Sequence, residues 1–80
     1  MVYDNAVKHY VFPIVIERDE DGYVAECPSL QGCHAQGKTY EETMANIRDA
    51  VELHVQDRKA CGEPVEAPSM VSVTTLEVSA

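Results

Sequence analysis

Eighty residues are enough for one domain, and a chain of this length buries only about 60% of the surface that its unfolded form exposes. Fourteen acidic residues against six basic ones give a formal net charge of −8, which opposes binding to nucleic-acid phosphates and to anionic lipid surfaces. We therefore expect a thin core that self-association would stabilise, and a basic protein as the partner. The alternative is that the acidity only keeps a small protein in solution.

The first eight residues, Met1–Lys8, include Asp4, Asn5 and Lys8 and lack the basic start and apolar run of a secretion signal. No segment is long and apolar enough to span a bilayer. The three cysteines are an odd number and do not suggest a disulfide framework. These features predict a cytoplasmic protein whose thiols stay reduced.

Residues 10–27 have the pattern of a β-hairpin. The run YVFPIVI at 10–16 is rich in β-branched and aromatic residues, and YVAEC at 23–27 resumes that character after an acidic turn. Gly22 suits the positive-φ position that closes such a loop. Pro13 cannot donate a ladder hydrogen bond, so we expect an edge strand, or a bulge, at that position.

A third strand at 33–36 and a helix follow the hairpin. Thr39 and Glu42 match a capping box, in which the Thr39 hydroxyl accepts from the Glu42 amide and the Glu42 carboxylate reaches back to the Thr39 amide. Gly62 supplies the stop. Residues at helical spacing between these signals are Met44, Ile47, Val51, His54 and Val55.

The chain after the helix reads as an extended linker at 63–69 and a last strand at 70–79. The apolar alternation of this strand changes phase near Thr74, as a bulge or a change of partner would require. We expect its apolar residues to mediate oligomerisation: Val71, Val73, Leu76 and Val78.

The whole chain, 1–80, is thus predicted to be one α+β domain with a core at 10–62. The element order is β-β-β-α-β, an antiparallel meander sheet with one helix packed on one face. A dimer or larger homo-oligomer is expected from the small core and from the apolar last strand.

The two faces of the predicted hairpin differ in character. A turn that pairs Arg18 with Tyr23 places Ile16 opposite Ala25, and alternation puts Phe12, Ile14 and Cys27 on the same, core face. The opposite face carries Val11, Pro13, Val15 and Val24, bordered by Glu17 and Glu26. One helix cannot cover both faces, so we predict that Val15, Glu17, Val24 and Glu26 bind a partner. The alternative is that scattered valines on a solvated face need no partner.

Catalytic chemistry has weak support in the sequence. Glu17, Asp19 and Glu26 lie near one end of the hairpin, and clustered carboxylates hold divalent cations in phosphoryl-transfer enzymes. Acidic residues flank most exposed hairpins, however, so a solvated rim is the preferred interpretation. His54 has no nucleophile motif beside it. We expect no catalytic residue and no cofactor.

A zinc site is also disfavoured. Cys27, Cys33 and His34, with the distant Cys61, offer suitable ligand atoms. The spacing between the first two cysteines misses the tight pairs of structural zinc sites, and alternation sends both into the core while His34 points outward. We expect no metal site.

The stretch from Tyr10 to about Pro64 resembles the HicB family of antitoxin domains. The resemblance rests on the order and spacing of four features: the acidic turn closing on Gly22-Tyr23, the segment Pro28…Leu30…Gly32-Cys33, Gly37-Lys38-Thr39 with Glu41-Glu42, and Asn46. It implies a partly formed RNase H-like sheet without the nuclease's carboxylate set. It also implies a role in neutralising a small basic RNA-cleaving toxin of the HicA type by covering the toxin's surface.

Two features depart from the family. Ser29 and Gln31 stand where the family usually has an acidic residue and a second proline, which changes the detail of partner recognition more than the fold. Many members carry a DNA-binding segment after this domain, whereas only the linker and one strand follow the helix here, so we expect no direct nucleic-acid binding. Two alternatives rank below the antitoxin: an orphan oligomeric binding domain without a toxin, and a metal-dependent nuclease remnant.

Overall fold

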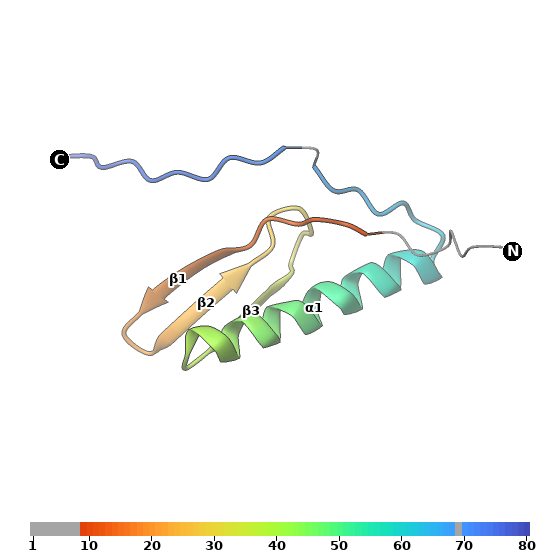
Figure 1. The fold of residues 1–80 in the computed structure, drawn as a ribbon, viewed down its shortest axis with the longest axis horizontal. Coiled ribbons are helices and arrows are strands. Elements are labelled where there is room, and N and C mark those ends of the chain that lie inside the picture. The colour runs from red at the N-terminus through yellow and green to blue at the C-terminus, as the bar shows by residue number, and fades with distance from the viewer. Residues whose placement is uncertain (1–8, 69) are drawn as a thin grey trace, which may run out of the picture.

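The structure is a computed structural model that describes residues 9–68 and 70–80, and its elements are three strands followed by one helix (Figure 1). The strands form one antiparallel sheet in the order β1-β2-β3, and α1 packs on one face. This arrangement confirms the predicted α+β meander with a single covering helix. The elements are β1 (Val15–Asp19), β2 (Gly22–Glu26), β3 (His34–Gly37) and α1 (Tyr40–Ala60).

The register of the β1–β2 hairpin is the predicted one, because Ile16 lies opposite Ala25 and Arg18 lies opposite Tyr23. The first strand is shorter than predicted. It begins at Val15 and not at residue 10, since β2 ends at Glu26 and the chain before Val15 extends past the end of its neighbour. We call the extended stretch 10–14 the arm.

The turn between β1 and β2 is held by the side chain of Asp19. Its carboxylate accepts hydrogen bonds from the amides of Asp21 at 2.8 Å and Gly22 at 2.9 Å. Gly22 has a φ of 145°, and a Cβ at this position would collide with the carbonyl oxygen of Gly37. Both the backbone conformation and the close approach of β3 therefore require glycine here.

The loop between β2 and β3 folds back on itself and closes the core. The Cys27 amide donates to the Cys33 carbonyl, and the Leu30 amide donates to the Cys27 carbonyl, each at 3.0 Å. Leu30 and both thiols are buried, as predicted for the cysteines. Burial raises the pKa of the Cys27 thiol, and burial with the nearby Cys27 raises the pKa of the Cys33 thiol, so both favour the neutral form.

The helix α1 begins with a modified capping box. The Thr39 hydroxyl accepts from the Glu42 amide at 3.0 Å, as predicted. The Glu42 carboxylate, however, accepts from the Lys38 amide at 2.6 Å and not from the Thr39 amide. Thr39 is extended, with φ −124° and ψ 162°, and the carboxylate bonds the amide one residue further back.

The helix ends in a Schellman motif. The Glu63 amide donates to the Arg58 carbonyl at 2.8 Å, the Gly62 amide donates to the Lys59 carbonyl at 3.1 Å, and Gly62 has a φ of 76°. Arg58 and Lys59 also place positive charge at the negative end of the helix dipole. The predicted glycine stop is confirmed.

The core lies between the sheet and α1, and Ile47 stands at its centre with 1% of its surface exposed. The buried hydrophobic residues are Ala25, Cys27, Leu30, Cys33 and Ile47. Partly buried residues packed against them include the predicted Phe12, Ile14, Ile16, Ala35, Met44 and Val51. At the edge of this core, the Asn46 amide donates to the Gln36 carbonyl at 2.8 Å and fastens α1 to β3.

The single chain forms three of the four predicted strands. Residues 70–80 are extended but form no strand, and no backbone hydrogen bond joins them to another described segment. A strand pattern in the sequence becomes a strand only when a partner satisfies its amides and carbonyls. The expectations for Met1–Lys8, and for Ser69 in the linker, fall outside the described residues.

Candidate functional site

The face of the sheet opposite α1 is open and carries the four predicted partner-binding residues. Glu17, Val24 and Glu26 are exposed, and Val15 is half-buried. Alternation along the strands places all four on one side, away from the Ile16–Ala25 pair that faces the core. We define the open face as these residues with two from β3: Val15, Glu17, Val24, Glu26, His34 and Gln36.

The open face consists of two rows across the sheet. One row runs from Val15 through Glu26 to His34, and the other runs from Glu17 through Val24 to Gln36. Each carboxylate thus lies directly across from a valine. The two carboxylates are diagonal neighbours, roughly 7 to 8 Å apart at the backbone for such positions, so their mutual repulsion is moderate.

This arrangement suits the binding of long basic side chains. A valine beside each carboxylate offers apolar surface to the methylene stem of Lys or Arg, while the carboxylate receives the charged end. Val24 is 37% exposed, which leaves its isopropyl group accessible from solvent. His34 and Gln36 add hydrogen-bonding groups along the β3 side. The open face therefore combines apolar and charged groups, as protein interfaces do.

His34 and Gln36 are the members of the open face that sequence analysis did not assign to the site. Alternation alone placed His34 outward, but its position beside Glu26 depends on the register of β2 against β3. That register is set by the loop between these strands, where the Cys33 amide bonds the Leu30 carbonyl at 3.0 Å. The sequence signal was Gly32, which lies between these two residues and has a φ of 80°.

The groups considered for metal binding are separated in space. Cys27 and Cys33 lie in the core, His34 is exposed, and Cys61 is exposed at the end of α1. Within residues 9–68 and 70–80, no three or more His, Cys, Asp and Glu side chains group in a way that could hold a metal ion. The described part of the chain also contains no helix with the length and apolar character needed to cross a bilayer.

The four predicted oligomerisation residues lie apart from the open face, on the extended segment that follows the linker (Figure 1). All of them are exposed, and Leu76 is the most exposed at 87%. The four are Val71, Val73, Leu76 and Val78. The structure therefore presents two separate surfaces with apolar character.

Comparison with known proteins identifies relatives over most of the chain. A family profile described as the HicB-like antitoxin of a bacterial toxin-antitoxin system matches residues 12–78. A UPF0150 protein of Archaeoglobus fulgidus is 44% identical over 68 residues, which cover 84% of this chain and 93% of that protein. A UPF0150 protein of Synechocystis sp. is 40% identical over 63 residues, which cover 78% and 80% of the two chains.

A solved structure shares the fold. The crystal structure of the N-terminal domain of the Burkholderia pseudomallei antitoxin HicB is similar, with a TM-score of 0.67 and 31% sequence identity. The match covers 75% of this chain and 72% of that domain. The arrangement of three antiparallel strands followed by a helix is common to both.

Proposed function

The chain belongs to the HicB-like antitoxin family of bacterial toxin-antitoxin systems, and from this premise we propose that it neutralises a small basic RNA-cleaving toxin of the HicA type. Family membership supports the antitoxin role in general. The proposal adds two points: the class of toxin, and the surface of this chain that covers the toxin. The toxin binds the open face, through Val15, Glu17, Val24 and Glu26.

The observation that carries this proposal is the pairing of each open-face carboxylate with a valine across the sheet. A toxin that binds RNA presents Lys and Arg side chains where the phosphates bind. Glu17 and Glu26 occupy positions that can receive those side chains, and Val15 and Val24 can pack against their stems. The net charge of −8 favours rapid encounter with such a partner. Inhibition then results from occlusion of the toxin's RNA-binding surface.

The proposed place of action is the cytoplasm, where an RNA-cleaving toxin meets its substrate and where the three free thiols stay reduced. Binding requires no reaction by this chain, in agreement with the non-enzymatic role that the family suggests. We also expect no direct binding to operator DNA, since the open face and the chain as a whole are acidic.

Co-expression with any small basic protein that is encoded beside this chain tests the proposal. The wild-type chain is expected to restore growth and to co-purify with the toxin. Exchange of both carboxylates, Glu17→Lys with Glu26→Lys, places like charges against the toxin and should weaken binding by about 100-fold or more, with loss of growth rescue. Isothermal titration calorimetry on the purified proteins measures the change.

A matched control separates the open face from overall charge. Asp49→Lys with Asp57→Lys changes two exposed carboxylates on α1, and each pair of substitutions moves the formal charge from −8 to −4. The helix variant should rescue growth nearly as well as wild type at physiological salt. Equal loss in both variants would show that net charge, and not the open face, governs binding. A complex unaffected by either pair would exclude the open face as the toxin-binding surface.

A further inference from the structure

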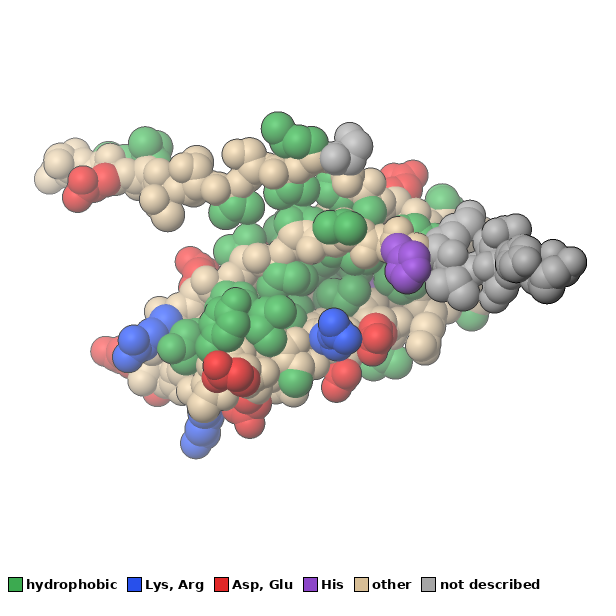
Figure 2. All heavy atoms as spheres, in the orientation of Figure 1, with side chains coloured by type: hydrophobic (Ala, Val, Ile, Leu, Met, Phe, Trp, Pro, Cys, Tyr) green, Lys and Arg blue, Asp and Glu red, His purple; other side chains and the backbone are tan. Residues whose placement is uncertain are grey.

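The segment after the linker is the most apolar exposed stretch in the described chain. Five large hydrophobic side chains within nine residues stand in solvent: Met70, Val71, Val73, Leu76 and Val78. They make up more than half of the large hydrophobic residues that the described structure exposes, and they are spaced along one extended segment (Figure 2). A run of this kind with β-branched residues is normally covered in a folded protein.

The edge of β1 offers the complementary surface. β1 has a hydrogen-bonding neighbour only on the β2 side, so its other edge presents free amides and carbonyls among the described strands. Beside this edge an apolar groove separates the arm from α1, and Figure 2 shows hydrophobic side chains gathered there. The groove is lined chiefly by Phe12, Ile14, Met44, Ile47, Val51 and Val55. Only Ile47 among these is fully buried.

Among the described residues, the segment and the edge of β1 both lack backbone hydrogen-bond partners, and the segment and the groove both expose apolar side chains. A strand placed along the edge of β1 would satisfy the backbone groups of both and would cover the apolar groove with alternate side chains. The phase change near Thr74 lets Val71 and Val73, and then Leu76 and Val78, point into the groove across a bulge. We propose that the segment Val71–Val78 of a second copy adds to the edge of β1 as a fourth strand, so that two chains exchange these segments reciprocally.

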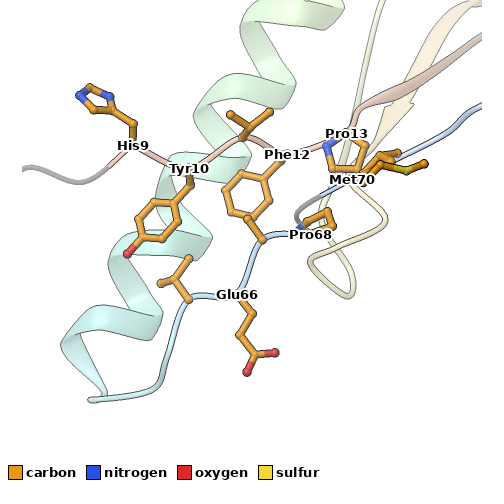
Figure 3. A pocket seen from close by; sticks show the side chains of 11 residues that line it. His9, Tyr10, Phe12, Pro13, Glu66, Pro68 and Met70 are labelled. Carbon is orange, nitrogen blue, oxygen red and sulfur yellow. The ribbon is translucent and has the colours of Figure 1, made fainter.

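The geometry of the linker favours a second copy over the chain's own sheet. The segment begins beside the later part of the arm, and Figure 3 shows Pro68 near Phe12 and Met70 near Pro13 around one hollow. From there the segment and β1 diverge, and neither the segment nor the outer edge of β1 has a strand partner among the described residues (Figure 1). The linker contains Pro64 and Pro68, and two prolines in seven residues keep it extended and oppose a return to the chain's own β1.

Exchange between two copies would also enlarge the small hydrophobic core. Each copy carries the free edge of β1 and one free apolar segment, so a twofold arrangement pairs these two elements at once and leaves neither of them exposed. A domain of 80 residues with five buried hydrophobic side chains is in the size range where oligomerisation commonly completes the fold. This inference does not depend on the proposed toxin. It concerns the outer edge of β1, which faces away from β2.

The mass in solution is the first test. Analytical ultracentrifugation of the full chain at tens of micromolar should give twice the chain mass of 8.8 kDa. Leu76→Asp should shift the protein to the monomer mass, since a carboxylate would enter the groove. Leu53→Asp is the matched control on α1, where the side chain is 66% exposed, and should stay dimeric. A monomeric wild type, or a dimer that survives removal of residues 70–80, would overturn the proposal.

Disulfide trapping distinguishes a second copy from the chain's own sheet. In a Cys61→Ser background, Glu17→Cys at the middle of β1 and Thr74→Cys at the middle of the segment form a bond when the two strands lie side by side. Non-reducing electrophoresis after mild oxidation should show a covalent dimer that needs both new cysteines, with each single variant as control. A covalent monomer, whose bond lies within one chain, would contradict the exchange. This assay does not depend on whether Leu76→Asp folds.

Discussion

The two faces of the sheet are made of the same three strands but differ in burial and in composition. The face under α1 holds Ile16, Ala25 and Ala35, which pack with Ile47 in the core. The open face alternates valine with glutamate and contributes little buried area. The comparison teaches that the period-two alternation of the strands separates the residues that stabilise the core from those that we propose for recognition, although they are neighbours in sequence.

The largest expected effect lies in the covered face. Ile47→Ala removes the central helix residue of the core and should lower the free energy of unfolding by about 2 to 5 kcal/mol, through lost burial and a residual cavity. Urea denaturation followed by circular dichroism measures the loss. If Ile47→Ala were as stable as a variant altered on the open face, the claim that only the covered face contributes strongly to stability would be wrong.

A substitution at Gly22, next to the turn between β1 and β2, tests a position that holds the strands of both faces together. Gly22→Ala forces a side chain into a backbone with φ of 145° and against the Gly37 carbonyl. We expect destabilisation of about 2 to 3 kcal/mol. Gly32→Ala is the control, since its φ of 80° imposes backbone strain but its Cβ meets open space. Thermal denaturation that ranks Gly32→Ala as the worse variant would contradict the argument from the close approach of β3.

Removal of the N-cap of α1 should have a smaller effect on the free energy of unfolding. Thr39→Ala removes the hydroxyl that accepts from the Glu42 amide at 3.0 Å and should lower stability by about 1 kcal/mol. Thr39→Ser keeps the acceptor and should restore most of the loss. Chemical denaturation of the two variants gives the difference, and equal stabilities would show that the cap contributes nothing.

The open face should show the smallest effect on folding. Glu17→Gln with Val24→Thr alters two exposed positions and should change the free energy of unfolding by no more than about 0.5 kcal/mol. The same variant should bind the proposed toxin at least about tenfold more weakly, because it removes one charge and the apolar contact opposite it. A loss of stability as large as that of Ile47→Ala would mean that the open face is part of the fold's core.

Local signals in the sequence were sufficient for most of the fold. The acidic turn with Gly22 fixed which residues of the hairpin face each other, and register then determined both faces. Thr39 and Gly62 marked the two ends of the helix. These predictions succeeded because a turn or a cap depends on residues within a few positions of it. The placement of Val15, Glu17, Val24 and Glu26 on one side of the sheet followed from the same alternation.

Features that depend on a partner were less predictable. The strand pattern at 10–16 extends beyond the end of β2, so only its last residues are paired in β1. The pattern at 70–79 lacks a neighbour altogether within one chain. The position of His34 beside Glu26 needed the loop geometry between β2 and β3. Hydrophobic periodicity reports which residues prefer burial in a strand, but it contains no information about where the neighbouring strand comes from.

The loop that buries Cys27 and Cys33 also gives this protein a built-in reporter of its own opening. Cys61 is exposed and should react at once with an alkylating reagent, whereas the other two thiols react only when the loop and the core separate. Their alkylation rate relative to that of an unfolded chain yields the free energy of that opening event, as amide exchange does for the backbone. A toxin bound on the open face leaves this loop on the far side of the strands, so the two buried thiols would record how far stabilisation spreads through a sheet only three strands wide.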